Sequence, residues 1–317
     1  MLSKPKLAIV VPCFNEMETL SFCFHGLNKI LDEMKAAEMV SGDSIIFFVD
    51  DGSVDQTWYA IKDLSLKKPC VKGLKLSKNF GHQPALLAGL IEVSNNCDIS
   101  ISIDADLQQD PRAMIDFVEK YRAGAEIVVG VRNNRNSDSF FKKQTSKIFY
   151  RLMELMGVQI IPNHADYRLL TSRAIFSISK FSRHGIFLRS ACLKLGFKTE
   201  ISYFDVTKRE FGESKYSVKK MLQLALHGIT SFSVAPLRIV GFLGFWLFLL
   251  TLIMGLYVGW HALVAGDTVP GWASTVLPIY FIGGVQLLCL GIVGEYIGKI
   301  YMAVQDRPSW IVEEVIE

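Results

Sequence analysis

Two long apolar segments near the carboxyl end constrain the fold of this chain more than any other feature. Residues 239–258 and 276–294 carry almost no polar side chains, and the only formal charges between Ile239 and Gly298 are Asp267 and Glu295. A helix that rises about 1.5 Å per residue needs roughly 20 apolar residues to cross about 30 Å of hydrocarbon. The alternative is a pair of buried core helices. The scarcity of charge favours two transmembrane helices, at about 237–262 and 275–300.

The lysines and arginines around these segments predict their orientation. Basic residues precede the pair and follow it, whereas the connection 262–275 has no Lys or Arg. By the positive-inside rule, both termini then lie in the cytoplasm and the protein is a multi-pass protein of the inner (cytoplasmic) membrane. The flanking basic residues are Lys219, Lys220, Arg238, Lys299 and Arg307.

The residues before these segments have the pattern of an α/β domain. Short apolar runs alternate with stretches of helical periodicity, which favours a mainly parallel sheet built from strand–helix–strand crossovers. A formal net charge of +3 is too small to indicate a nucleic-acid partner. We expect a cytoplasmic domain at 1–215, an interfacial amphipathic helix at 216–235, and the two membrane helices with a short tail at 236–317. The predicted strands are Leu7–Val11, Ile45–Val49, Val71–Leu76, Ile99–Ile103 and Glu126–Gly130, and the predicted helices are 17–37, 56–66, 84–93 and 111–121.

Polar residues follow each of the first four predicted strands, where an open parallel sheet binds its ligands. The fourth strand is followed by Asp104, Asp106 and Gln108. Two carboxylates and an amide oxygen suit a hard divalent ion that keeps positions open for phosphate oxygens. An Asp-rich turn that caps the helix beginning at Pro111 is the alternative. The turns after the other strands are 12–16, 50–53 and 77–82, and no GxGxxG or GxxxxGK[ST] motif is present.

These turns together resemble the successive motifs of family 2 glycosyltransferases with a GT-A fold. The motifs are Pro12–Glu16, Asp50–Ser53, Asn79–Gln83 and Asp104–Gln108. Nearly the whole chain, including the two apolar segments, is similar to the branch that transfers sugars to polyprenyl phosphates. That branch includes dolichyl-phosphate mannose synthase and the bactoprenol glucosyltransferases.

The resemblance implies a role for each matching residue. Asp104, Asp106 and Gln108 match the positions for Mg²⁺ or Mn²⁺ and the diphosphate. Asp166 matches a position considered for a base or for positioning the acceptor, although it could equally orient Arg168. The nucleotide-sugar positions are Pro12, Asn15, Glu16, Asp50, Asp51 and Asp104; the acceptor-phosphate positions are Arg132, Arg135, Arg209, Ser214 and Lys215; the catalytic positions are Asp166, Arg132 and Arg209.

A polyprenyl phosphate acceptor explains why a sugar-transfer domain would be tied to a membrane. Residues 216–232 and 141–157 have the apolar and basic pattern of interfacial helices, with packing against the domain core as the alternative. We expect an inverting transfer of a hexose from a nucleotide sugar, with UDP-glucose favoured over GDP-mannose or another UDP-sugar, to undecaprenyl phosphate for cell-envelope glycan modification. A homo-oligomer is also expected. The competing hypotheses are a polysaccharide synthase, which the absence of a QxxRW motif disfavours, a nonenzymatic nucleotide-sugar sensor, and a lipid-linked sugar flippase.

Overall fold

The protein consists of two compact units, and the C-terminal residues belong to the same unit as the N-terminal residues. The first unit comprises Met1–Arg151, Gln159–Tyr216 and Asp306–Glu317, and the second comprises Leu152–Val158 and Ser217–Gln305. The computed structural model describes residues 4–133, 161, 164–180, 188–205, 272–305 and 308–316, together with single positions between 237 and 260.

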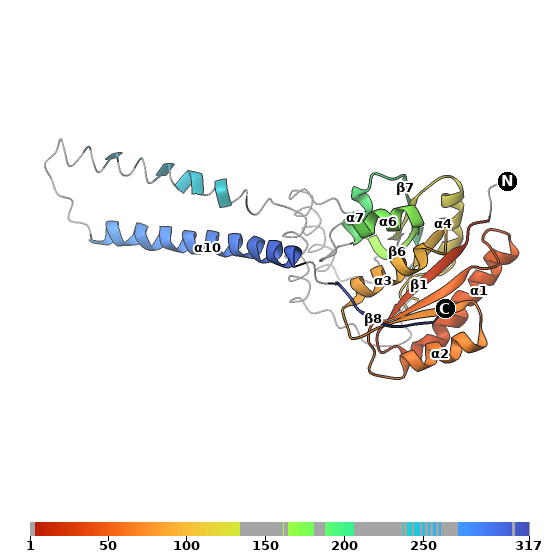
Figure 1. Ribbon diagram of the computed structural model, residues 1–317. Coiled ribbons are helices and arrows are strands. Elements are labelled where there is room, and N and C mark those ends of the chain that lie inside the picture. Colours follow the sequence, from red (N-terminus) through yellow and green to blue (C-terminus); the bar gives the residue numbers. More distant parts are fainter. Residues whose placement is uncertain are drawn as a thin grey trace. The chain divides into compact units, whose positions relative to one another are not determined.

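The first unit contains an eight-stranded sheet in the order β7-β5-β6-β4-β1-β2-β3-β8 (Figure 1). Strand β6 is antiparallel to β4 and β5, and β8 is antiparallel to β3, whereas the other neighbouring strands pair in parallel. The sheet is therefore mixed but mostly parallel, as predicted. The strands are β1 Leu7–Cys13, β2 Ile45–Asp50, β3 Val71–Leu76, β4 Ile99–Ser102, β5 Ile127–Arg132, β6 His164–Thr171, β7 Thr199–Phe204 and β8 Val312–Ile316.

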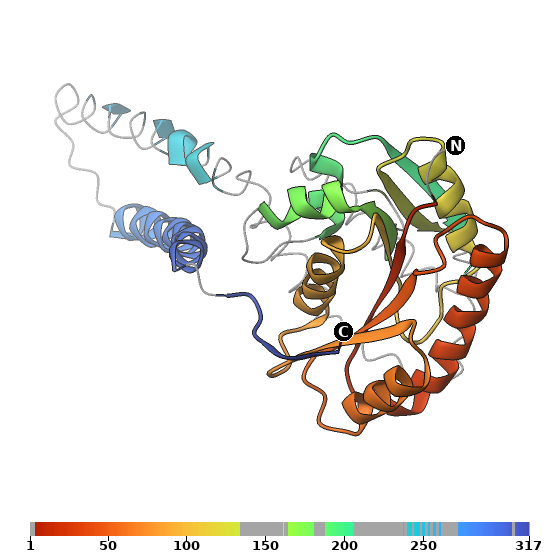
Figure 2. The same cartoon turned by 45° about the vertical axis from the view of Figure 1, so that its right-hand side comes forward.

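Helices cover both faces of this sheet (Figure 2). Residues of α1, α2 and α4 share one hydrophobic core with one face, and residues of α3, α6 and α7 share a second core with the other. Every residue of β1 and β2 is buried, which explains why these strands appear in the sequence as continuous apolar runs. The helices are α1 Met17–Ala36, α2 Thr57–Lys67, α3 His82–Ser94, α4 Ala113–Arg122, α6 Ser172–Lys180 and α7 Leu188–Lys194.

The structure confirms the five predicted strands and the four predicted helices, with small shifts at their ends. Strands β6, β7 and β8 were not predicted. Strand β8 lies in the segment expected to be only a tail, and it forms the edge of the sheet beside β3.

The second unit contains α10, Trp272–Val304. Among the residues that the structure describes, only one helix is long and apolar enough to cross a membrane, through Phe281–Gly298 with a mean hydropathy of 1.6. Large apolar side chains on it, such as Leu287 and Leu290, are exposed. The first predicted span, 237–262, is described only at scattered positions, so this crossing of the membrane remains a prediction. The predicted interfacial segments 141–157 and 216–235 lie outside the described residues.

Candidate functional site

The predicted site residues come together at the carboxyl edge of the sheet. Strands β1, β2, β3, β4 and β5 end at this edge, and strand β6, which runs antiparallel to β4 and β5, begins there. The edge therefore gathers side chains from six strands and the turns between them. Of the predicted residues within the described part of the chain, it holds Pro12, Asn15, Glu16, Asp50, Asp51, Asp104, Asp106, Gln108, Arg132 and Asp166.

The turn after β1 is bonded to the turn after β2. The Asn15 backbone N–H donates to Ser53 Oγ at 2.9 Å, and the Asn15 side-chain oxygen accepts from the Val54 N–H at 3.0 Å. Asn15 has a φ of 54°, in the left-handed region that Asn tolerates better than most residues. The Glu16 N–H donates to Thr57 Oγ1 at 2.9 Å. These bonds hold the turns after β1 and β2 in one arrangement.

Asp50 and Asp51 present buried carboxylates at the end of β2. The Ser53 N–H donates to Asp50 Oδ1 at 3.2 Å, while Asp50 Oδ2 has no hydrogen-bond partner within the described residues. The Asp51 carboxylate accepts from the N–H groups of Phe80 and Gly81, at 2.8 and 2.9 Å. Burial raises the pKa of both carboxyls, although these hydrogen bonds oppose the shift. Asp51 therefore connects the loop after β3 to the end of β2. Asp50 Oδ2 is a buried acceptor without a partner within the described residues.

Gly52 allows the loop after β3 to approach this turn. It has a φ of 64°, and a Cβ added there would lie 2.2 Å from the carbonyl carbon of Lys78. We expect Gly52→Ala to lower the free energy of unfolding by about 2 kcal/mol, because it combines a left-handed backbone with a backbone clash. Gly42→Ala is the control, since a Cβ there meets no atom within 4 Å. Thermal unfolding of both variants tests this, and equal midpoints would contradict the proposed close approach.

The carboxylate pair follows β4 in a tight turn. Gln109 brackets Asp104, donating its side-chain N–H to the Asp104 carboxylate while its side-chain oxygen accepts the Asp104 backbone N–H. Asp106 Oδ1 accepts from the Gln108 N–H at 3.2 Å. Asp110, rather than either member of the pair, accepts from the Arg112 N–H at the start of α4. Asp110, which belongs to the same Asp-rich run, thus bonds to the backbone that precedes α4.

Residues that the sequence did not single out connect the pair to Asp166. His82 Nε2 lies 3.7 Å from Asp104 Oδ1 and 3.8 Å from Asp166 Oδ2, and the Gln83 amide donates to the same Asp166 oxygen at 3.1 Å. Both residues stand at the start of α3. They belong to the Asn79–Gln83 motif, so the signal was present in the sequence, but no role had been given to them.

Asp166 forms an ion pair with a completely buried arginine. Arg168 has no exposed surface, and its guanidinium donates to Asp166 Oδ1 and, at 3.5 Å, to Cys192 Sγ. Asp166 is itself only 10% exposed at its side chain. The two carboxylate oxygens are thus divided between Arg168 on one side and the start of α3 on the other. This geometry favours a role for Asp166 in orienting Arg168 over a role as a freely accessible base.

One predicted acceptor-site residue is described, and it lies at the carboxyl end of β5. Arg132 is the last residue of β5, is exposed, and pairs with Phe204 of β7. The remaining predicted acceptor-site residues lie outside the described part of the chain: Arg135, Arg209, Ser214 and Lys215.

The chemistry of the carboxylate pair fits a hard divalent cation. The Asp104 side chain is 35% exposed. Partial burial raises its pKa, with Asp166 and Asp106 adding to the shift while His82 and Gln109 oppose it. A cation would relieve this accumulation of negative charge, with Asp104, Asp106 and Gln108 as its ligands. Within the described residues, no three His, Cys, Asp or Glu side chains are arranged so that together they could hold a metal ion.

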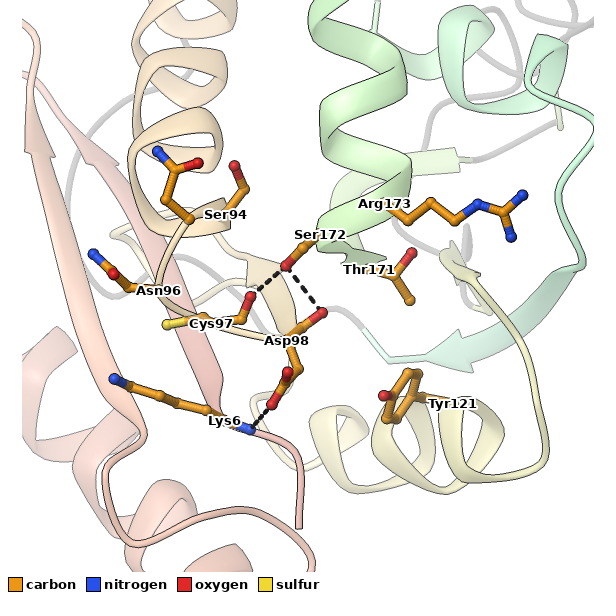
Figure 3. Close-up of a pocket in the computed structure, with 10 residues that line it drawn as sticks. Lys6, Ser94, Asn96, Cys97, Asp98, Tyr121, Thr171, Ser172 and Arg173 are labelled. Carbon is orange, nitrogen blue, oxygen red and sulfur yellow. Dashed lines mark hydrogen bonds between the residues drawn. The ribbon is translucent and has the colours of Figure 1, made fainter. Parts of the chain in front are cut away.

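A polar hollow lies at the amino ends of β1 and β4, at the end of the sheet opposite to the candidate site (Figure 3). Several of its polar groups bond to one another: the Lys6 backbone N–H donates to Asp98 Oδ2 at 2.7 Å, and the Ser172 hydroxyl lies against the carbonyls of Cys97 and Asp98. These bonds join the ends of three strands, which is a structural role. The hollow is separate from the candidate site.

Comparison with protein-family models finds two matches in this chain. Residues 8–183 match the model described as glycosyl transferase family 2. Residues 235–300 match the model described as the GtrB C-terminal hairpin, and this range includes the whole of both predicted membrane helices.

Full-length relatives and a solved structure agree with these matches. YkoT of Bacillus subtilis, an uncharacterized glycosyltransferase, is 46% identical over 98% of this chain and 92% of its own. The bactoprenol glucosyl transferase of Shigella phage SfII is 35% identical over 98% of both chains. The crystal structure of mannosyl-3-phosphoglycerate synthase from Rubrobacter xylanophilus superimposes with a TM-score of 0.50, at 13% identity over 75% of each chain. That last likeness concerns the fold alone.

Proposed function

The chain belongs to glycosyl transferase family 2, and from this premise we propose that it transfers a hexose from a nucleotide sugar to a polyprenyl phosphate on the cytoplasmic face of a membrane. The main support for this proposal is the carboxylate pair Asp104 and Asp106 at the carboxyl edge of the sheet. The chain that carries this pair aligns over 98% of its length with a bactoprenol glucosyl transferase. The relatives' names, bactoprenol glucosyl transferase, favour a bactoprenol carrier as acceptor and glucose as the sugar. We take the carrier to be undecaprenyl phosphate and the donor to be UDP-glucose.

The position of β8 supports a membrane hairpin with both ends on one side. Strand β8 pairs with β3 in the same sheet as β1. A chain that leaves this sheet, enters a bilayer and returns to the same sheet must cross the bilayer an even number of times. If α10 spans the membrane, it therefore requires a partner crossing. The apolar segment at 237–262 is the predicted partner, and 235–300 match a family model named as a hairpin.

In the proposed reaction, an oxygen of the acceptor phosphate attacks the anomeric carbon of the sugar. A bond forms between that oxygen and carbon, the bond from the carbon to the diphosphate breaks, and the nucleoside diphosphate leaves on the opposite face with the bonding electrons. The anomeric configuration inverts. A phosphate monoester has a second pKa near 6, so it is largely dianionic at neutral pH and needs little help from a base.

The residues of the site have separate tasks in this reaction. Asp50 and Asp51 line the proposed nucleoside site, where Asp50 Oδ2 is buried and has no hydrogen-bond partner within the described residues. Mg²⁺ or Mn²⁺ held by Asp104, Asp106 and Gln108 would supply Lewis-acid stabilisation of the departing diphosphate. Arginine presents fork-shaped donors that match phosphate oxygens, which suits Arg132, together with Arg135 and Arg209, to the acceptor phosphate. Ser214 and Lys215 complete the proposed acceptor site.

Transfer of label from a radioactive nucleotide sugar to a lipid tests this function. Membranes that contain the protein are incubated with undecaprenyl phosphate, Mg²⁺ or Mn²⁺, and UDP-glucose, UDP-galactose or GDP-mannose in turn. We expect label from UDP-glucose to enter the organic phase, and label from the other two donors to enter it much more slowly. A different preferred donor would change the sugar and keep the reaction class.

Two outcomes of the same assay would overturn the proposal. One is that the protein binds a nucleotide sugar but no label reaches the lipid with any donor and either metal. This outcome would indicate a sensor. The other is full transfer by Arg132→Ala and Arg209→Ala, which would contradict the acceptor site. A homo-oligomer joined through the hairpin is part of the proposal, and cross-linking in membranes tests it.

A further inference from the structure

The C-terminal strand β8 pairs with β3, and the loop that follows β3 contributes to the proposed donor site. Its register with β3 pairs Gly73 with Ile316 and Leu74 with Val315, and it shifts between Lys75 and Leu76. Beyond the strand, the Ser77 N–H donates to the Ile311 carbonyl at 2.9 Å. The pairing therefore continues to the first residue of the loop that follows β3.

Side chains also fix β8 to α2 and to the core. The carboxylate of Glu314 accepts from the Trp58 indole N–H at 2.9 Å and pairs with Lys62 at 2.7 Å. Trp58 is buried, so Glu314 provides a partner to an indole N–H that has little access to water. Ile316 packs against one hydrophobic core and Trp310 against the other.

The loop after β3 links this strand to the proposed nucleoside site. Ser77 is bonded to the segment just before β8, and three residues later Phe80 and Gly81 donate their backbone N–H groups to the Asp51 carboxylate. The same loop packs against Gly52 so closely that a Cβ there would meet its backbone. A continuous series of bonds therefore runs from β8 through this loop to Asp51.

We propose that β8 positions the loop after β3, residues 77–81. Binding of a nucleoside diphosphate would then depend on a strand that follows the membrane segment in the sequence. Residues 305–311 connect α10 to β8, and β8 begins opposite Leu76, at the carboxyl edge of the sheet. The amides of Phe80 and Gly81 remain aimed at Asp51 while β8 is paired. The part of this inference that concerns the nucleotide rests on the proposed function.

Loss of β8 should loosen the loop after β3 and weaken nucleotide binding about tenfold. Without β8, the backbone groups of β3 would form an open sheet edge and the loop would lose its bond at Ser77. Few contacts would then oppose local opening of residues 77–81, and amide exchange measures such openings. Because the ligand binds only the closed loop, its apparent affinity falls in proportion to the closed fraction. A closed fraction of about one tenth would weaken binding about tenfold.

Deletion of residues 312–317 from the otherwise full-length protein in detergent tests the proposal. We expect faster amide exchange at residues 77–81 and an approximately tenfold weaker binding of UDP in the presence of Mn²⁺. A synthetic peptide with the sequence of residues 309–317 should restore both, because an extended peptide can add to an open edge. Rescue by the peptide also demonstrates that the shortened protein is folded.

A matched pair of point variants uses the intact chain. Glu314→Ala removes the partner of Trp58 and Lys62, whereas Glu313→Ala removes only the neighbouring ion pair with Lys75 at 3.0 Å. We expect faster exchange at residues 77–81 in Glu314→Ala and less change in Glu313→Ala. Unchanged exchange at these residues in both the deletion and Glu314→Ala would overturn the role of β8. If exchange responds as expected but the parent protein does not bind UDP, the positioning role stands and the proposed function fails.

Discussion

Asp106→Ala should reduce sugar transfer by about a hundredfold to a thousandfold while the protein remains folded. Asp106 is the strongest candidate ligand of the cation that would neutralise the departing diphosphate, and the loss of one strong electrostatic contact to developing charge typically lowers a rate by about 10²–10³. Its side chain accepts the Gln108 N–H within its own turn, and circular dichroism of the variant checks that the fold is kept. The measurement is label transfer to lipid, with UDP binding measured with and without Mn²⁺.

Asp110→Ala is the matched control for this experiment. Asp110 lies in the same turn and accepts from the Arg112 N–H at the start of α4. Its loss should lower the free energy of unfolding by about 1 kcal/mol, the typical net value of one hydrogen bond, and leave transfer nearly unchanged. Chelation of divalent cations should reproduce the effect of Asp106→Ala in the parent protein. Retention of more than about a tenth of the activity in Asp106→Ala would contradict the metal role, since the loss expected from such a contact is about 10²–10³.

The parts of the fold that follow simple periodicity were predictable from the sequence. Strands β1 to β5 are apolar runs between amphipathic helices, and the polar turns after them identify the edge that binds ligands. Strand β6 was missed because its sequence HADYRLLT places His164, Asp166 and Arg168 in a strand that is largely buried. Strand β8 was missed because VEEVI is short and mostly exposed, and its place depends on the distant edge of β3.

The site was predicted in outline, and its internal contacts were not. Arginine is rarely fully buried without a partner, so nothing in composition suggested an Arg168 with no exposed surface. The spacing did contain a signal: residues two apart on a strand share one face, which places Asp166 beside Arg168. The proximity of His82 to Asp104 and Asp166 depends on the orientation of α3 relative to β4 and β6, and no local pattern encodes that orientation.

Asp166→Asn should lower the free energy of unfolding by about 3–5 kcal/mol, because it leaves the buried guanidinium of Arg168 without a counter-charge. Arg168→Met in the same chain should recover most of this loss, since a buried ion pair can often be replaced by apolar side chains of similar volume at little cost. Thermal and denaturant unfolding of the single and double variants measures both effects. The Asp98→Asn variant provides a control, because Asp98 accepts a backbone N–H at the opposite edge of the sheet.

Sugar transfer by the double variant then separates the two roles of Asp166. If Asp166 served only to neutralise Arg168, removal of both charges would restore transfer together with stability. We expect stability to return and transfer to stay low, because Asp166 Oδ2 also accepts from Gln83 and lies 3.8 Å from His82, whose ring faces Asp104. A charged oxygen at this position holds the start of α3 against the carboxylate pair. An amide oxygen in its place would hold it less strongly, since hydrogen bonds to ionised groups are roughly twice as strong as neutral ones.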